Sequence, residues 1–521
     1  MGKHVKIASI FLFIGIVAIV GSKFVLPIVG DYLQTDSSDA KGTKGRITIG
    51  YDNWVGYFPL CSPEMKKRMR QSGYLLNCID DGANYVERYA KLASGEYNFA
   101  VGTVDSYIVN GADKDYPGVI TAVLDESKGG DAIVAWSDKI TSLDDFKSNE
   151  NLSIALTPDS PSEHLLKSVA VHFDIQNLRK DGAWLKETDG SSAALKAFSN
   201  KEVQAAVLWE PDVSRALSLK GVKRILSTKD TRQLIVDILI TNRRYSQKNP
   251  EVVELLLKNY FRTLKYYRDD NDKLINDISK STGLEKSAVE NLLNGVSWST
   301  LTDNVRRWYG TLSRSLSEEA LIDTIESTIE ILTNYGDIDR NPIPNQDPYR
   351  ITNSEFVNEL YKKNGLGGAF GDANKNLVSN DESLLSDFDT LSTKEWDRLS
   401  EIGTLKVRPI VFTSGTYLLT LEGKGQVDQA IENLKHYPNY RLEIRGHTGL
   451  RGDKKVNIEL SSDRADSVKR YINTTYNVDK DRMRAIGFGG QRPLKKQSGE
   501  SSRAYNYRLP RVEIVLVAQE L

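Results

Sequence analysis

A stretch near the end of the chain combines residue types that could hold a charged ligand. Ile444-Arg445-Gly446-His447-Thr448-Gly449 is followed, fifteen residues after Gly449, by Arg464 in the run Leu460-Ser461-Ser462-Asp463-Arg464-Ala465. A guanidinium carries its N–H donors in a fixed fork and can grip a carboxylate through two hydrogen bonds. Arg464 could therefore hold an acidic group in this way.

The rest of the sequence lacks the residue spacings of common catalytic and metal sites. The five histidines are scattered without a His-Glu-x-x-His pattern, and neither Gly-x-Ser-x-Gly nor a phosphate-binding loop occurs. The formal net charge of −1 gives no overall field that would attract nucleic acid. We expect a binding protein rather than an enzyme, with no catalytic residue, no cofactor, no metal and no nucleic-acid partner.

Composition divides the 521 residues into folded and linking parts. Residues 46–340 alternate strand and helix signals, which is typical of an α/β domain with largely parallel sheets. Residues 401–521 show a β-α-β-α-β order, in which Val427, Ala430, Ile431 and Leu434 make one helical face. The polar stretches at 31–45 and 341–400 are predicted to be a flexible tether and an interdomain linker.

The N-terminus has the features of an export or anchoring segment. Residues 7–29 are mostly apolar and long enough to cross a bilayer, and Lys3 and Lys6 place the preceding residues in the cytoplasm. We predict that residues 1–30 form an uncleaved signal anchor, a single transmembrane helix in the inner membrane, with the soluble domains in the periplasm. A cleaved signal peptide is the alternative.

The chain has two cysteines, Cys61 and Cys78, both near the start of the first folded part. In an oxidising compartment they could form a disulfide that stabilises the fold by about 3 kcal/mol. Two unpaired, partly buried thiols are the other interpretation. The prediction of export makes the disulfide the candidate to examine.

Two local patterns bear on where a ligand could bind. Leu92 to Val101 and Phe198 to Val207 share a helix–turn–strand pattern, which suggests two similar α/β lobes. Ser160, Pro161 and Glu163 predict a helix start with a capping box, directly after a short strand. Free N–H groups at such a helix start favour an anion, although a well-capped structural helix explains the same residues.

The segment Ile47 to Tyr57 resembles the opening of periplasmic solute-binding proteins of the nitrate, taurine/sulfonate and thiamine-precursor type. Three further stretches fit this resemblance: Gly102 to Ser106, Ser127 to Asp131 and Leu208 to Pro211. The resemblance implies two α/β lobes around a cleft that closes by hinge motion. It places lobe 1 at about 46–135 and 237–340, and lobe 2 at about 136–236, with a crossover near Ala135 and a return near Asp237.

The resemblance also implies which residues reach the cleft. Aromatic side chains there could stack on a flat or cationic group, carboxylates could pair with nitrogen donors, and hydroxyls could hold an oxyanion. The number of carboxylates favours a small polar, nitrogen-bearing ligand. The candidate ligand-binding residues are Tyr51, Asp52, Trp54, Tyr57, Thr103, Asp105, Ser127, Asp131, Ser160, Ser162, Trp209, Glu210 and Asp237.

The last 120 residues resemble OmpA-like peptidoglycan-binding domains, through the His-Thr and Leu-Ser-x-x-Arg-Ala motifs quoted above. In that family an Asp after His-Thr and the Arg of the second motif hold the charged ends of diaminopimelate. Arg464 matches the Arg, whereas Gly449 replaces the Asp, and Asp453 in the same loop has the wrong spacing for a simple swap. The residues that the resemblance implies for peptidoglycan binding are His447, Thr448, Asn457, Leu460, Arg464, Arg503 and Asn506.

Together these features predict a two-lobed periplasmic-binding-protein fold and an α+β OmpA-like domain behind an inner-membrane anchor. The expected function is a receptor that binds a small polar ligand and attaches to peptidoglycan, weakly because of Gly449. A structural envelope tether with a degenerate cleft is the alternative. Envelope proteins are expected as further partners.

Overall fold

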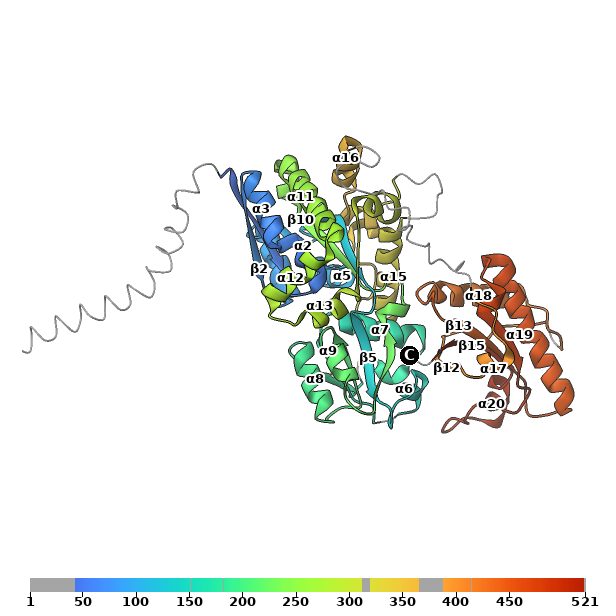
Figure 1. Cartoon of the computed structure of the whole chain (residues 1–521). Coiled ribbons are helices and arrows are strands. Elements are labelled where there is room, and N and C mark those ends of the chain that lie inside the picture. The colour runs from blue at the N-terminus through green and yellow to red at the C-terminus, as the bar shows by residue number, and fades with distance from the viewer. Residues whose placement is uncertain are drawn as a thin grey trace, which may run out of the picture.

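Three sheets organise the computed structural model of the chain (Figure 1). The structure describes residues 43–149, 151–180, 182–311, 319–364, 388–413 and 415–519. The predicted anchor at residues 7–29 lies outside these ranges. Within them, no helix has the length and apolar character that a membrane crossing requires.

The first sheet forms lobe 1 and has the strand order β11-β4-β10-β3-β1-β2. Strand β1 pairs in parallel with both β2 and β3, whereas β10 runs antiparallel to β3 and β4. The strands are β1 (Gly45–Tyr51), β2 (Tyr74–Asp80), β3 (Phe99–Thr103), β4 (Gly118–Ser127), β10 (Val236–Asn242) and β11 (Val296–Trp298). The main helices on this sheet are α2 (Phe58–Cys61), α3 (Pro63–Gln71), α4 (Tyr85–Ser94), α5 (Val104–Ala112) and α11 (Pro250–Asp269).

The second sheet forms lobe 2 and has the order β7-β6-β8-β5-β9. In β5, Ile133 and Ala135 face the core under α7, while Ala132 and Val134 face the core under α8, so the strand is buried on both faces. The strands are β5 (Asp131–Trp136), β6 (Ile154–Leu156), β7 (Leu185–Glu187), β8 (Ala205–Trp209) and β9 (Val222–Ser227). The helices are α6 (Asp144–Ser148), α7 (Pro161–His172), α8 (Ser191–Ser199) and α9 (Asp212–Leu217).

The two sheets repeat one plan, in which β2-β1-β3-β10-β4 of lobe 1 corresponds to β7-β6-β8-β5-β9 of lobe 2. The repeated sequence pattern falls on equivalent elements, α4 with β3 and α8 with β8, which confirms the prediction of two similar α/β lobes. The chain crosses between lobes at residues 128–130 and returns just before β10. The crossover is therefore a few residues earlier than the predicted Ala135, because the polar, glycine-containing stretch between β4 and β5 already connects the two sheets.

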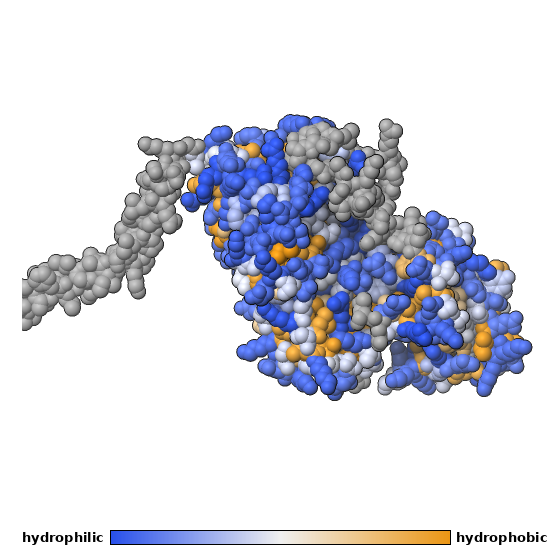
Figure 2. Space-filling view, viewed as in Figure 1, coloured by the Kyte–Doolittle hydropathy of each residue, from blue (hydrophilic) through white to orange (hydrophobic). Residues whose placement is uncertain are grey.

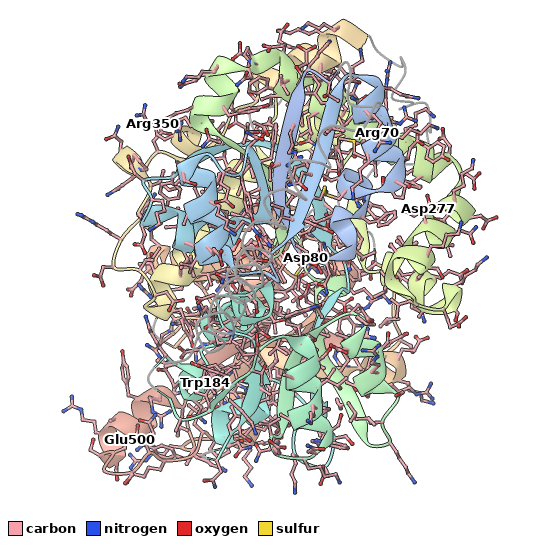
Figure 3. All side chains as sticks on the ribbon, turned by 90° about the vertical axis from the view of Figure 1, so that its left-hand side faces the viewer. Arg70, Asp80, Trp184, Asp277, Arg350 and Glu500 are labelled. Carbon is pink, nitrogen blue, oxygen red and sulfur yellow. A yellow bond between two sulfur atoms is a disulfide. The ribbon has the colours of Figure 1, made fainter. Side chains whose placement is uncertain are left out.

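The carboxyl ends of β1, β2, β3 and β4 point towards lobe 2, whereas the antiparallel β10 begins at that edge. Figure 3 shows Asp80, the last residue of β2, near the middle of the molecule. Trp184 of lobe 2 lies below it in this view. Tyr51 ends β1 directly opposite Asp80 in the register of the parallel pair. Side chains at these strand ends therefore face the space between the lobes.

The segment predicted as an interdomain linker is folded over its first part. The side chains of Ile343, Ile351, Val357 and Leu360 are buried in the core of lobe 1, and Thr352 forms a β-bridge to Ile120. Helix α16 (Glu355–Asn364) packs against α11. The domain boundary near residue 340 was therefore wrong, because prolines and polar residues masked apolar positions that are widely spaced in sequence.

The third sheet belongs to the C-terminal domain and has the order β12-β15-β13-β14. Its strands are β12 (Ser400–Thr404), β13 (Arg441–His447), β14 (Met483–Gly487) and β15 (Arg511–Ala518). Its helices are α17 (Thr393–Trp396), α18 (Leu421–Leu434), α19 (Lys454–Tyr476) and α20 (Ser502–Arg508). The predicted α18 face of Val427, Ala430, Ile431 and Leu434 is buried.

One apolar core extends from lobe 2 into the C-terminal domain. Phe173 of lobe 2 packs edge-on against Tyr437, and Ile331 of α15 (Ala320–Tyr335) joins the same cluster. The visible surface is mostly hydrophilic, with smaller hydrophobic areas on both lobes and on the C-terminal domain (Figure 2). Because the apolar core is continuous, the two-lobed domain and the C-terminal domain share an interface that excludes water.

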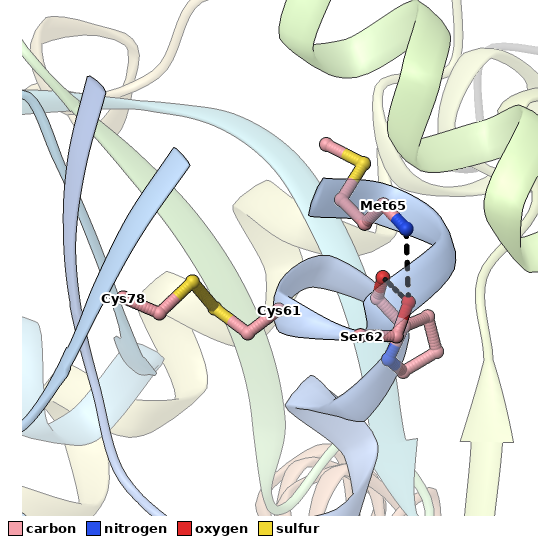
Figure 4. The surroundings of a disulfide bond; sticks show 5 residues. Cys61, Ser62, Met65 and Cys78 are labelled. Carbon is pink, nitrogen blue, oxygen red and sulfur yellow. Dashed lines mark hydrogen bonds between the residues drawn. A yellow bond between two sulfur atoms is a disulfide. The ribbon is translucent and has the colours of Figure 1, made fainter. Parts of the chain in front are cut away.

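Cys61 and Cys78 form a disulfide that ties the end of α2 to β2 (Figure 4). The bond closes a loop with a sequence separation of 17 residues. Beside it, the Ser62 hydroxyl accepts a hydrogen bond from Met65 N and starts α3. The disulfide thus fixes the first helices of lobe 1 on its edge strand.

Replacing both cysteines by serine is expected to lower the free energy of unfolding by about 3 kcal/mol, because a loop of this length gains that much entropy in the unfolded chain. Denaturant unfolding of lobe 1, followed by tryptophan fluorescence, measures the change. Reduction of the parent protein should give the same loss. An unchanged midpoint in both samples would show that the bond carries no stability.

Candidate functional site

The cleft between the lobes is lined by the start of α5 on one side and by the start of α7 on the other. A small hollow of about 20 Å³ lies there, which is enough space for a water molecule. Its wall also includes Leu332 of α15, which packs against both α5 and α7. The lining residues are Asp105, Ser106, Val109, Asn110, Asp159, Ser160, Glu163, His164, Lys167 and Leu332.

Two polar side chains in this wall are buried without a partner. Asp105 is 7% exposed and His164 is 2% exposed. The Asp105 Oδ1 atom and both ring nitrogens of His164 have no hydrogen-bond partner among the residues that the structure describes. Burial lowers the pKa of His164, and the charge of Asp105 opposes that effect. Buried polar groups almost always have partners, so water or a ligand is expected between these two.

Helix α7 starts after Ser160 with Pro161 in its first turn, as predicted, but its hydrogen bonds differ from the prediction. The Ser160 hydroxyl donates to the carbonyl of Thr157 at 2.6 Å, and Glu163 accepts from the backbone N–H of Asp159 at 2.8 Å. The predicted capping box is therefore absent, because each side chain bonds within the preceding turn. The nearby Ser162 hydroxyl is fully buried and has no partner among the described residues.

Most of the other predicted cleft residues bond to one another or to the scaffold. The Tyr57 hydroxyl donates to Asp237, and Trp54 Nε1 donates to Asp125 Oδ1 at 3.1 Å. Asp52 forms an ion pair with the buried Arg88, with 3.0 Å between Arg88 Nη2 and Asp52 Oδ2. These groups lie at the strand ends as predicted, but their hydrogen-bonding capacity is largely used within the protein.

Of the remaining candidates, Ser127 and Glu210 behave in the same way, whereas the buried Thr103 hydroxyl has no hydrogen-bond partner among the described residues. The Ser127 hydroxyl donates to Asp131 Oδ2 at 2.8 Å. Glu210 accepts from the Ser214 hydroxyl at 2.8 Å. Trp209 and Tyr51 are half-buried, and Thr103 is the N-terminal cap residue of α5. The structure thus brings Asp105 and Ser160 to the hollow. The prediction missed His164 and Lys167, which also line the hollow, and it missed Asp125 and Arg88, which bond to predicted residues outside it.

Burial perturbs the carboxyl groups at the base of the cleft. Desolvation raises the pKa of Asp131 to about 7 and that of Asp125 to about 7. Desolvation and the neighbouring Asp125 raise the pKa of Asp237 well above its usual value. Asp125 and Asp237 are opposite each other in the register of β4 and β10, the strands that lead out of and back into lobe 1.

Asp131→Asn is expected to stabilise the protein above pH 7. The folded protein holds a proton on Asp131 up to about pH 7, whereas an unfolded Asp ionises near pH 4, so stability falls as pH rises through this window. The variant does not lose stability in this way. Its free energy of unfolding should exceed that of the parent by roughly 2–4 kcal/mol at pH 8, and the difference should shrink towards pH 4. Denaturant unfolding at several pH values measures the gap. Asp138→Asn, at an exposed carboxylate, should match the parent at every pH.

The C-terminal domain has a second candidate site where two loops meet. The backbone N–H of Thr448 donates to the Gly489 carbonyl at 2.9 Å, joining the loop after β13 to the loop after β14. His447 is buried, lies 3.2 Å from Glu513 through Nε2, and stacks on Phe488. His447 therefore supports the loop rather than facing solvent.

Arg464 lies on α19 with part of its guanidinium unused. Its Nε donates to the Thr416 carbonyl at 3.0 Å, and the group lies over the ring of Phe412. Desolvation lowers the pKa of Arg464. Its two terminal nitrogens have no partner among the described residues and remain available for a carboxylate.

Space is open beside Gly449. A Cβ atom built there would meet nothing within 4 Å, so the lost side chain has not been replaced by a neighbour. Asp453 caps α19 by accepting from the N–H groups of Lys455 and Val456, which occupies the carboxylate nearest in sequence. Asn457 donates to the Arg451 carbonyl, Leu460 is half-buried, and Arg503 and Asn506 are exposed on α20.

Comparison with known proteins identifies the family of the C-terminal domain. Residues 411–507 match the model of the OmpA family. The C-terminal domain is an OmpA-like domain. It is 37% identical over 86 residues to the outer membrane protein Omp38 of Acinetobacter baumannii, covering 16% of this chain and 24% of that protein. It is 34% identical over 83 residues to a peptidoglycan-associated lipoprotein of Legionella pneumophila, covering 16% of this chain and 47% of that protein.

The chain thus spans less than half of the length of these two relatives, and the likeness is confined to the OmpA-like domain. The remainder is similar in fold to the periplasmic sulfonate-binding protein SsuA from Methylobacillus flagellatus, with a TM-score of 0.47 and 14% identity over 62% of this chain and 95% of that protein. The two-lobed architecture itself follows from the strand order of the two sheets.

Proposed function

We propose that this protein is an envelope receptor that attaches to peptidoglycan through its OmpA-like domain. The free edge of the Arg464 guanidinium supports the proposal, since it presents two donors beside a domain that matches the OmpA family. The Legionella relative is named for peptidoglycan association. The absence of a carboxylate at residue 449 leaves an amine in the ligand without its partner, so attachment is weak.

Attachment is tested with the full-length protein in detergent, sedimented with purified peptidoglycan. Arg464→Ala should reduce the bound fraction at least tenfold. Arg470→Ala is the matched control, because Arg470 lies exposed on the same helix. Equal binding by the parent and Arg464→Ala would contradict the assignment of Arg464, and no binding by the parent would contradict attachment.

We further propose that residues 7–29 hold the protein in the inner membrane, with both domains in the periplasm. The disulfide between Cys61 and Cys78 supports an oxidising compartment. Membrane fractionation with an alkaline wash separates an integral anchor from a released soluble protein. Recovery of the protein in the soluble periplasmic fraction would contradict the anchor.

The cleft is proposed to bind a small, nitrogen-bearing ligand. The observation that supports it is the buried pair of unpartnered groups, Asp105 and His164, in a hollow that also contains Glu163. Glu163 is already paired with Lys167 at 3.1 Å, whereas the buried Oδ1 atom of Asp105 lacks a donor, which favours a ligand that brings an N–H group. The hollow as it stands is small, so either the ligand is small or the lobes open to admit it.

A structural tether with a cleft that binds nothing is the second candidate. It is favoured by the internal bonds of Asp52, Asp237 and Glu210, which leave few groups for a ligand. Thermal unfolding with a panel of small amines and amino acids separates the two. A ligand at 1,000 times its Kd adds about 4 kcal/mol of stability.

The receptor proposal expects a stabilising compound whose effect is lost in Asp105→Asn and kept in Asp113→Asn, an exposed carboxylate at the end of the same helix. If no compound in the panel stabilises the parent, the tether is favoured.

A further inference from the structure

Two helices run from the cleft to the OmpA-like domain. The first turns of α7 line the hollow with Glu163, His164 and Lys167, and its last residue, His172, contacts the OmpA-like domain. Helix α15 lines the hollow through Leu332 and contacts the OmpA-like domain through Ser327. A movement of either helix therefore reaches both places.

Helix α15 also connects the two lobes. It packs against α5 of lobe 1 and α7 of lobe 2. Just beyond its end, Asp337 forms an ion pair with Lys167 of α7, with 2.6 Å between the charged atoms, and Lys167 lies over the ring of Tyr335. If the lobes separated, α15 would lose its contacts either with α5 or with α7.

His436 of the OmpA-like domain lies where α15, α7 and residues 228–235 meet. Residues 228–235 connect β9 of lobe 2 to β10 of lobe 1 and are called the return segment. Its Nε2 is 2.9 Å from the Ser327 hydroxyl of α15, and its Nδ1 is 3.1 Å from the Arg232 carbonyl. The Arg232 N–H donates back to the His436 carbonyl at 3.0 Å. The His436 ring stacks on His172 with 5.2 Å between centroids.

Further contacts fix the OmpA-like domain on lobe 2. The His172 Nδ1 atom is 2.9 Å from the Tyr437 hydroxyl, and the Lys406 N–H donates to the His172 carbonyl at 2.7 Å. Asp144 of α6 accepts from the N–H and hydroxyl of Thr404 at 2.9 and 2.8 Å. These bonds surround the shared apolar core. The interface of the OmpA-like domain with lobe 2 and α15, which we call the joint, is therefore packed.

We propose that the OmpA-like domain acts as a clamp on the two lobes, with His436 as its contact to both. While His436 holds α15 and the return segment together, the cleft stays closed. Release of this joint lets α5 and α7 separate. By linkage, whatever stabilises the closed cleft also stabilises docking of the OmpA-like domain, so events at the wall and in the cleft influence each other.

The inference goes beyond the proposed function, because it concerns how the two domains act on each other and does not require peptidoglycan binding. Backbone amide hydrogen exchange of the full-length protein in detergent tests it. His436→Ala removes the ring contacts to Ser327, to the Arg232 carbonyl and to His172, and it keeps the backbone bond from the Arg232 N–H. Gln429→Ala is the matched control, since Gln429 is exposed on α18, the helix that precedes His436.

In His436→Ala, amides at the starts of α5 and α7 should exchange at least fivefold faster than in the parent, although they lie away from the substitution. Gln429→Ala should leave them unchanged. Strands β3 and β13 report whether each domain is still folded. Ser327→Ala removes only the hydroxyl on α15. It should speed up amide exchange at the starts of α5 and α7 by a smaller factor.

A rise in exchange confined to the residues that touch His436, with the cleft segments unchanged, would overturn the proposal. So would equal exchange in the parent and both joint variants. A failure of peptidoglycan sedimentation leaves this readout unaffected, so the two proposals fail separately.

Discussion

Replacing Arg88 by leucine is expected to lower the free energy of unfolding of the two-lobed domain by about 3–5 kcal/mol. Arg88 is fully buried and donates to Asp52, to Asp81 and to the Val101 carbonyl. Leucine would leave both carboxylates without their partner in a dry environment. That cost is larger than the cost of breaking any exposed ion pair among the described residues.

The change is measured by denaturant unfolding, followed by the fluorescence of tryptophans in the two lobes. Arg70→Leu is the matched control, because Arg70 is exposed at the end of α3 and should change stability by less than about 0.5 kcal/mol. A loss in Arg88→Leu no greater than in Arg70→Leu would show that Asp52 and Asp81 do not depend on this arginine.

Gly446→Ala is expected to destabilise the OmpA-like domain by about 3 kcal/mol, at the upper end of the usual cost of overpacking. A Cβ atom at residue 446 would lie 1.9 Å from the Ser461 carbonyl oxygen, so α19 would have to move away from β13. This movement would also displace Arg464, and binding to peptidoglycan should fall together with stability.

Gly449→Ala is the control for this substitution, since its Cβ would meet nothing within 4 Å. Hydrogen exchange of β13 in the full-length protein measures the stability of the OmpA-like domain directly. Parent-like protection of β13 in Gly446→Ala would mean that α19 does not lie as close to the sheet as the structure has it.

Local sequence patterns predicted the parts of the fold that depend on neighbours in the chain. The repeated helix–turn–strand pattern correctly indicated two lobes, because α4 with β3 and α8 with β8 occupy equivalent places. The His-Thr and Leu-Ser-x-x-Arg-Ala motifs correctly indicated the OmpA-like domain. Both signals are contained within short segments, so a single sequence is sufficient to show them.

Contacts between distant residues were beyond such patterns. Asp52 looks like a ligand-binding carboxylate until Arg88, 36 residues later, is found beside it. Ile343 and Leu360 lie in a proline-containing, polar stretch, and only the packed core of lobe 1 shows that they are buried. The joint at His436 has a sequence separation of 109 residues from Ser327, and no local pattern marks it.

We propose that Arg464 and its neighbours attach this protein to the peptide part of the cell wall. The most direct test compares binding of the full-length parent protein to intact peptidoglycan and to glycan strands from which the stem peptides have been removed. We predict saturable binding to the intact polymer that is lost with the peptides and with Arg464→Ala. Equal binding to both polymers, or binding to neither, would contradict the claim.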